Sequence, residues 1–384
     1  MRSAAIARLT IGTVERCEGP AEAYLRADGF DRHTFHCGQS GSGKTYSLGV
    51  ILEQLLARTK LRLIIIDPNS DFVRMANIRS GSGAQSAYQR QAKRLLVLRP
   101  AAQAEQGGQA LRLWFSDLTV DEQAAVLQLD PLHDREEYNE LATITATFDG
   151  RRYSLADVRE AARDLLSGQG RQLVLRIDNL RVADWAIWAH GDQASSADAI
   201  REDTRGLIVD VGSLPSVAEK SAAAAAVLGA LWRSRDRREP ILVVIDEAHN
   251  VCPAEPSGAL QAKAAEYCIN IAAEGRKYGR YLLLATQRPQ KLHRNVLSQC
   301  DNLVLMRMNS RADLQDLAEV FSFVPANLLE EASRFQQGEA LLAGKIVPSP
   351  LIARFGRRIS EEGGADVATD WADVSRASRT PRRK

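Results

Sequence analysis

The chain has 384 residues, and its 50 lysines and arginines nearly balance its 48 aspartates and glutamates, leaving a formal net charge of +2. With 45% hydrophobic and 26% charged residues, the composition is typical of a globular protein and excludes disorder as the main state, because disorder requires low hydrophobicity and an excess of charge. No apolar run approaches the roughly 18 residues that span a bilayer, so we expect no membrane partner. The length favours about two domains.

The cysteines and the charged C-terminal end indicate the environment of the protein. The five cysteines are scattered, without C-x-x-C or zinc spacing, which predicts reduced thiols and a cytoplasmic location. Cys37 beside His36 leaves a catalytic thiol as an alternative. Residues 373–384 carry five basic side chains against Asp373, so the remainder of the chain is slightly acidic and any nucleic-acid contact must be local.

The predicted strands are short apolar runs, the pattern of strands buried on both faces of a parallel sheet. In chain order they lie at 34–37, 62–66, 95–98, 207–211, 241–245, 281–285 and 303–306. Helical patterns occupy 46–58, 218–234, 259–277 and 311–320. Because the strands alternate with helices, the sequence predicts a doubly wound α/β sheet.

The stretch 117–200 interrupts this alternation and predicts an inserted group of helices. Thr119 and Ser154 each begin a capping-box pattern, the sequence signature of a helix start. Trp185 and Trp188 have helical spacing, and we expect them in the core of a helix. The resulting division is a short segment 1–30, an α/β core at 31–100 and 201–360, a helical insertion at 101–200, and a C-terminal segment 361–384 with a basic tail.

Residues 38–45 match the pattern G-x-x-x-x-G-K-[ST] in full. Such a loop curls so that its backbone N–H groups point at phosphate oxygens, its lysine reaches the β- and γ-phosphates, and its hydroxyl ligates Mg²⁺. A strand precedes this loop and a helix follows it, so the helix N-terminus also favours an anion. We therefore expect ATP and Mg²⁺ as cofactors. The residues predicted to hold the nucleotide are Gly38, Gly41, Ser42, Gly43, Lys44, Thr45 and Tyr46.

Two other strand ends supply the remaining candidates. The run 241–245 ends in Asp246 and Glu247, and we assign Asp246, with Thr45, to the metal and Glu247 to polarising the attacking water. The run 281–285 is followed by Gln287, placed where open α/β sheets bind ligands. Arg276 ends a helix in a cationic cluster. It either complements the helix dipole or enters the site of a neighbouring subunit. The predicted catalytic residues are therefore Glu247, Lys44, Arg276 and Gln287.

Six motifs in order resemble the HerA family, in the HerA/FtsK branch of P-loop motor ATPases. They are the P-loop, the segments 64–72 and 245–250, and then 274–279, 285–289 and 297–300. The resemblance implies a RecA-like core with a helical insertion in a usually hexameric ring, with Arg276 acting on the next subunit. Asp246–His249 also resembles the DEAH-box tetrad. We exclude that class because its arginine-rich C-terminal motif is absent and some 200 residues separate Lys44 from Asp246.

The chain departs from this family at its N-terminal end. Family members usually carry a β-barrel of about a hundred residues before the P-loop domain, whereas only some 30 residues precede His33. We expect the barrel to be missing or reduced to one or two strands.

The resemblance predicts an ATP-driven DNA translocase or helicase. We expect a homo-hexamer that grips double-stranded DNA without sequence preference and works with a nuclease or another effector. The candidate DNA-contacting segments are 74–99, which has six basic residues and no acidic one, and 251–258. Two alternatives stay open: an ATPase scaffold that gates an effector, for example in antiviral defence, and a conjugation or secretion motor.

Overall fold

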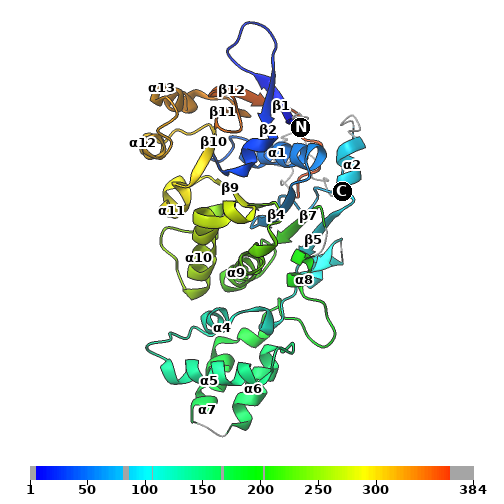
Figure 1. Ribbon diagram of the computed structural model, residues 1–384, viewed down its shortest axis with the longest axis vertical. Coiled ribbons are helices and arrows are strands. Elements are labelled where there is room, and N and C mark those ends of the chain that lie inside the picture. Colours follow the sequence, from blue (N-terminus) through cyan, green and yellow to red (C-terminus); the bar gives the residue numbers. More distant parts are fainter. Residues whose placement is uncertain (1–5, 81–85, 106, 166–167, 202–203, 364–384) are drawn as a thin grey trace, which may run out of the picture.

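One twelve-stranded sheet forms the framework of the protein in the computed structural model, which describes residues 6–80, 86–105, 107–165, 168–201 and 204–363 (Figure 1). In spatial order the strands are β2 (Glu22–Arg26), β1 (Arg8–Val14), β12 (Leu351–Phe355), β11 (Glu339–Gly344), β10 (Cys300–Met306), β3 (His33–Cys37), β9 (Arg280–Thr286), β8 (Ile241–Ile245), β4 (Arg62–Asp67), β7 (Gly206–Asp210), β5 (Leu95–Arg99) and β6 (Gln109–Ala110).

The strands from β10 to β6 run parallel, whereas β2, β1, β12 and β11 pair antiparallel at one edge. All seven strands predicted from apolar runs belong to the parallel part, so the prediction of an α/β fold around a parallel sheet is confirmed. The strands β11 and β12 and the two-residue β6 were not predicted, whereas β1 and β2 lie in the segment 1–30, where one or two strands were an open alternative. Parallel strands expose their carboxyl ends at one edge of the sheet, and the loops that follow β3, β8 and β9 meet there.

Helices cover both faces of the sheet and also form a separate lobe (Figure 1). They are α1 (Lys44–Arg58), α2 (Ser86–Ala92), α3 (Ala101–Ala104), α4 (Val120–Val126), α5 (Arg135–Thr147), α6 (Leu155–Asp164), α7 (Gly168–Leu180), α8 (Ser196–Arg201), α9 (Val217–Arg233), α10 (Ala259–Glu274), α11 (Arg294–Leu297), α12 (Arg311–Val320) and α13 (Ala326–Glu330).

The core has two parts because the central strands are apolar on both faces. Along β4, Leu63 and Ile65 pack in the cluster that contains residues of α1, whereas Ile64 and Ile66 pack in the cluster that contains α9 and α10. All four side chains are fully buried. Successive residues of a strand point to opposite faces, so a continuous apolar run is what a sheet covered by helices on both sides requires.

Helices α4 to α7 form the helical subdomain inserted between β6 and β7, at the lower end of the view in Figure 1. Both predicted capping boxes are present: the Thr119 hydroxyl accepts from the backbone N–H of Glu122, and Ser154 caps α6 in the same way. The helical prediction for Trp185 and Trp188 is wrong. Both follow the short 3-10 turn Val182–Asp184, and their rings stack with centroids 6.0 Å apart. The backbone turns there because the indole N–H of Trp188 donates to the Val182 carbonyl and Trp188 forms a β-bridge with Leu113.

The N-terminal strands β1 and β2 form a hairpin that joins the sheet through β12. This hairpin projects from the upper end of the molecule in Figure 1. None of the described helices is both long and apolar enough to cross a membrane. The basic tail at 373–384 lies outside the described residues.

Candidate nucleotide site

A cavity of about 780 Å³ opens at the carboxyl edge of the parallel strands, beside the P-loop. Five of the seven residues predicted to hold the nucleotide are among its lining residues, together with Glu247 and Gln287. Gly38 and Ser42 lie behind this surface and are fully or almost fully buried. The segments that supply these residues follow β3, β8 and β9, which are adjacent strands in the sheet.

The glycines of the P-loop are required by its backbone path. Gly43 has φ +92° and lies directly before the first residue of α1, a conformation that costs other residues free energy. At Gly38 a Cβ atom would lie 2.7 Å from both Met306 Cβ and Ser42 Oγ. The loop therefore curls tightly against β10, with the N–H of Gly338 donating to the carbonyl of Ser42 at 2.9 Å.

Lys44 is clamped between two carboxylates. Its Nζ atom lies 2.5 Å from Asp246 Oδ1 and 3.0 Å from Glu247 Oε1, and its side chain is 7% exposed. Burial lowers the pKa of Lys44, but the charges of Asp246 and Glu247 outweigh burial, so the net shift is upward. Lys44 is consequently a fixed cation at the mouth of the P-loop.

The oxygen atoms beside Lys44 suit a small divalent cation. Asp246 is fully buried, and its Oδ2 atom has no hydrogen-bond partner among the described residues. The Thr45 side chain lines the same cavity. Carboxylate and hydroxyl oxygens, completed by phosphate and water, are the ligands that Mg²⁺ prefers. Thr45 and Asp246 therefore fit a Mg²⁺ ion that takes its remaining ligands from a nucleotide and water.

A row of short contacts runs from Glu247 to the end of β9, although Glu247 Oε2 has no hydrogen-bond partner among the described residues. Glu247 has φ +43°, an uncommon conformation for a residue other than glycine, and its Oε2 lies 3.3 Å from His249 Nδ1. The same nitrogen is 2.9 Å from Thr286 Oγ1, which also accepts from the N–H of Arg288 at 3.0 Å. Burial lowers the pKa of His249, despite the opposing charge of Glu247. These contacts connect Glu247 to Arg288, the residue that follows Gln287.

Sequence reasoning missed one wall of the cavity. This wall is contributed by Asp71 and by residues after β10, namely Gln337, Gly338, Phe355, Gly356, Arg357 and Glu362. Only Asp71 belonged to a quoted motif, where it had no assigned role. The other residues follow no nucleotide-binding pattern and reach the P-loop because β11 and β12 fold back beside β10.

Two aspartates with raised pKa values lie at the end of β4 and in the turn after it: Asp67, the last residue of β4, is fully buried, and Asp71 is partly buried and lines the cavity. Burial raises the pKa of Asp67 to about 7, although its carboxylate accepts hydrogen bonds from the N–H groups of Asp71 and Phe72. Burial and the charge of Asp246 raise the pKa of Asp71 to about 6. The cavity is thus rich in carboxylates and contains one buried lysine.

Arg276 does not line the cavity of its own chain. It lies in the 3-10 turn Gly275–Tyr278, at the opposite end of β9 from Gln287, and its Nη1 is 2.8 Å from Asp301 Oδ2. The strand spans roughly 20 Å at about 3.3 Å per residue, so Arg276 cannot reach this P-loop. Its side chain is 41% exposed and free to meet another molecule.

The alternative of a catalytic Cys37–His36 pair is wrong. Cys37 is fully buried, and burial raises the pKa of its thiol far above the usual range. Burial also lowers the pKa of His36 to about 3. The His36 ring instead contacts Ser47 Oγ of α1, with 3.1 Å between Nε2 and Oγ, so both residues serve the packing of β3 against its neighbours.

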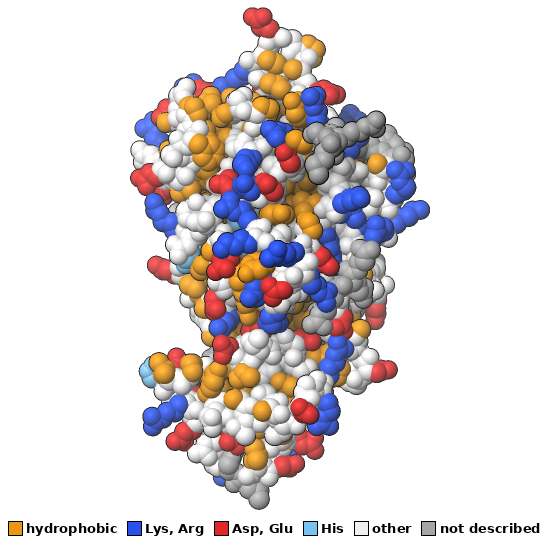
Figure 2. Space-filling model, in the orientation of Figure 1, with side chains coloured by type: hydrophobic (Ala, Val, Ile, Leu, Met, Phe, Trp, Pro, Cys, Tyr) orange, Lys and Arg blue, Asp and Glu red, His pale blue; other side chains and the backbone are white. Residues whose placement is uncertain are grey.

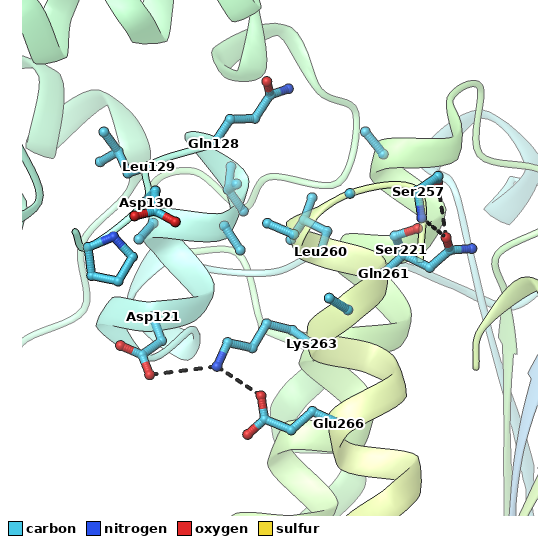
Figure 3. A pocket seen from close by; sticks show the side chains of 18 of the residues that line it. Asp121, Gln128, Leu129, Asp130, Ser221, Ser257, Leu260, Gln261, Lys263 and Glu266 are labelled. Atoms are coloured by element: carbon cyan, nitrogen blue, oxygen red, sulfur yellow. Dashed lines mark hydrogen bonds and ion pairs between the residues drawn. The ribbon is translucent and has the colours of Figure 1, made fainter. Parts of the chain in front are cut away.

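A second cavity, of about 760 Å³, lies between α4 of the insertion and the first turns of α9 and α10 (Figure 3). Most of its lining is apolar. Lys263 reaches across it toward Asp121 at 3.7 Å and also pairs with Glu266 at 3.0 Å. Its other polar contacts include those of Tyr138 with Asp121 and of Ser257 with Gln261. We assign this cavity to the joint between insertion and core and call it the joint cavity.

The profile of the family described as "Helicase HerA, central domain" matches residues 9–205. The DNA double-strand break repair helicase HerA of Sulfurisphaera tokodaii is 33% identical over 134 residues, or 34% of this chain and 26% of that protein. The protein of the same name from Saccharolobus solfataricus is 29% identical over 144 residues, or 36% of this chain and 28% of that protein. The aligned part therefore spans only about a quarter of the length of these curated relatives.

Two solved structures share the overall arrangement. VirB4 of Thermoanaerobacter pseudethanolicus superposes with a TM-score of 0.60 at 16% identity, covering 91% of this chain and 96% of that chain. The bacterial conjugative coupling protein TrwBdeltaN70 superposes with a TM-score of 0.59 at 14% identity, covering 95% and 97%. At these identities the likeness concerns the fold alone, and it agrees with a P-loop α/β core.

Proposed function

Because this chain belongs to the HerA helicase family, we propose that it is an ATPase that hydrolyses ATP between subunits of a homo-hexamer and uses the energy to move DNA. The observation that carries this proposal is the meeting of Lys44, Asp246 and Glu247 at one end of the P-loop cavity. Curated relatives that are named DNA double-strand break repair helicases support DNA as the partner.

The chemistry rests on positioning and charge, because phosphoryl transfer needs no covalent step from the protein. The backbone N–H groups of the P-loop bind the β-phosphate, and Lys44 exchanges its contacts with Asp246 and Glu247 for phosphate oxygens. Glu247, freed from Lys44, accepts a proton from the attacking water. Gln287 holds that water or the γ-phosphate from the neighbouring strand end.

Thr45 and Asp246 would hold Mg²⁺ between them. When bound, the ion neutralises charge on the phosphate oxygens. Asp246 Oδ1 accepts from the N–H of Glu247 at 2.9 Å, which holds the carboxylate in place, and Oδ2 has no hydrogen-bond partner among the described residues. The chain thereby orients its metal-binding oxygen before any nucleotide arrives.

Arg276 completes the site of an adjacent subunit in this proposal. Its position at the far end of β9 and its partial exposure support action on another copy. An arginine supplied in this way stabilises charge that develops on the transferred phosphoryl group.

The decisive experiment measures ATP hydrolysis by the purified protein with and without double-stranded DNA, with the assembly state recorded for each sample. Stimulation of several-fold by DNA in a hexamer is the expected result. Glu247→Gln serves as the control, since it keeps the shape of the site and removes the base. Turnover that ignores DNA but depends on an added effector protein would replace the motor with a scaffold function.

A further inference from the structure

The segment 288–294, between β9 and α11, presents three exposed cations and no acid. They are Arg288, Lys291 and Arg294. No aspartate or glutamate occurs between Tyr281 and Cys300. Among the described residues, no ion pair of Arg288 or Lys291 is formed, and Arg294 makes only a solvent-exposed one with Glu319 at 3.3 Å. Exposed pairs of this kind contribute little, so the charge of the segment is available to a partner.

The segment is held firmly against the loop that follows Glu247. Pro253 and Leu292 form a β-bridge, the N–H of Ala254 donates to the carbonyl of Lys291 at 2.8 Å, and the N–H of His293 donates to the carbonyl of Cys252 at 3.0 Å. The loops after β8 and β9 are therefore one rigid unit. In Figure 1 this unit lies beside α11, on the flank of the core next to α10 and α12.

The same segment is bonded to the hydrolytic site. Gln287, which lines the nucleotide cavity, directly precedes Arg288. The N–H of Arg288 donates to Thr286 Oγ1, which contacts the His249 ring, and that ring is 3.3 Å from Glu247. Three contacts, of 3.0, 2.9 and 3.3 Å, therefore connect the backbone of Arg288 to Glu247 through Thr286 and His249.

We infer that residues 288–294 form a contact surface for the DNA phosphate backbone, and that Thr286 couples this contact to Glu247. The inference rests on the proposed function and names the surface that this function requires.

The segment 288–294 differs from 74–99 and 251–258, the two candidate DNA-contacting segments indicated by the sequence. Segment 74–99 also has exposed cations, such as Arg74, although Arg79 pairs with Glu362 and Arg99 with Asp210. What distinguishes 288–294 is its row of contacts to Glu247 through Thr286 and His249. Segment 251–258 carries no cation, and its backbone pairs with that of 288–294.

Lysine and arginine side chains fit phosphates because each neutralised phosphate releases counterions, and this term carries no sequence preference. Both signs of charge occur over much of the visible face of the molecule (Figure 2). Three exposed cations with no acid between them are a place where a polyanion gains affinity.

The first test compares two double variants with equal change in charge. Arg288→Ala/Lys291→Ala removes the proposed contact, and Lys60→Ala/Arg237→Ala removes one exposed lysine and one exposed arginine from the opposite edge of the sheet. Binding of double-stranded DNA is measured by fluorescence anisotropy at several salt concentrations. We expect the slope of log K against log salt to fall by roughly two in the first variant, about one for each lost phosphate contact, and to stay unchanged in the second.

Equal slopes for wild type and both variants would overturn this inference alone, provided that wild type binds DNA. Equal losses in both variants would also overturn it, since the effect would then be one of overall charge. A wild-type protein that neither binds DNA nor responds to it overturns the proposed function and this inference together.

The coupling role of Thr286 has its own readout. Thr286→Val keeps the shape of the side chain and removes both hydrogen bonds, so we expect the ratio of turnover with DNA to turnover without DNA to fall toward one. Thr286→Ser restores the hydroxyl and should restore the ratio. A purely structural residue would lower both rates together and leave the ratio intact, which would contradict the coupling.

Discussion

At each of the two cavities of this protein, a lysine lies between an aspartate and a glutamate. The two sets of charges differ in how deeply they are buried. In the nucleotide cavity, Lys44 lies between Asp246 and Glu247, and all three side chains are less than 10% exposed. In the joint cavity, Lys263 lies between Asp121 and Glu266, and the three side chains are 25%, 61% and 53% exposed.

We propose that this difference in burial is why the first group of charges suits catalysis and the second does not. An ion pair in water is worth at most about 1 kcal/mol, whereas breaking a buried one costs several. Buried charges that are fixed before a ligand arrives also stabilise a transition state more strongly than solvated ones. The cavities have nearly the same volume, so volume alone would not have distinguished them.

The largest expected effect concerns Arg276, which does not line the nucleotide cavity of its own chain and which we propose acts on the cavity of an adjacent subunit. Arg276→Ala should lower the rate of ATP hydrolysis roughly 10³-fold or more while ATP affinity stays close to that of wild type. Steady-state turnover and equilibrium nucleotide binding, measured on the same preparation, check both parts.

Mixing subunits tests whether Arg276 acts between chains. Arg276→Ala subunits retain Glu247, and Glu247→Gln subunits retain Arg276, so a mixed ring contains some complete interfaces. The mixture should recover activity that neither variant has alone. A normal rate for Arg276→Ala by itself would remove Arg276 from the reaction.

Lys44→Met breaks the buried group of charges and should destabilise the nucleotide-free protein by about 3–5 kcal/mol at pH 7. The loss arises because Asp246 and Glu247 would remain as neighbouring buried carboxylates without a cation. Chemical denaturation measures the free energy of unfolding. A loss below about 1 kcal/mol would mean that water reaches the two carboxylates freely and that the comparison with the joint cavity is wrong.

Buried Asp67, behind the nucleotide cavity, should make stability depend on pH. Its folded pKa of about 7 lies above the ordinary value of 3.8, so between these pH values the folded state holds a proton that the unfolded state has lost. Stability from this group is therefore full at low pH and is lost as the pH rises toward 7. Relative to Asp67→Asn, wild type should lose roughly 2 kcal/mol between pH 5 and pH 8. A difference that is constant with pH would show that Asp67 is ionised throughout.

The sequence predicts those residues of the nucleotide cavity that belong to a short motif or directly follow a strand. The P-loop glycines, Lys44 and the acidic pair after β8 follow from strand ends and backbone geometry, and their approach in space agrees with those patterns. The fold prediction also held for seven of the eight parallel strands, since apolar runs need no partner to be recognised.

What the sequence could not predict depends on contacts between distant segments. The wall formed by Phe355 and Glu362 approaches the P-loop only because four antiparallel strands extend the sheet beyond β10. Among these strands, β1 and β2 alternate buried positions with exposed or partly buried ones, so neither forms a continuous apolar run. The helical prediction for Trp185 and Trp188 failed for a related reason. A spacing of three residues is typical of a helix, but it also occurs where a turn stacks two rings.

The smallest expected effect is that of Lys263→Met, the same substitution made in the joint cavity. Methionine keeps the apolar stem against α4 and removes only a partly exposed charge, and exposed ion pairs contribute about 0.2–1 kcal/mol. We expect the free energy of unfolding to change by less than about 1 kcal/mol and ATP turnover to stay within twofold, both measured beside Lys44→Met. A loss above about 2 kcal/mol would show that the pair with Asp121 fixes the insertion to the core. Burial alone would then not explain how Lys44 and Lys263 differ in their contribution to stability.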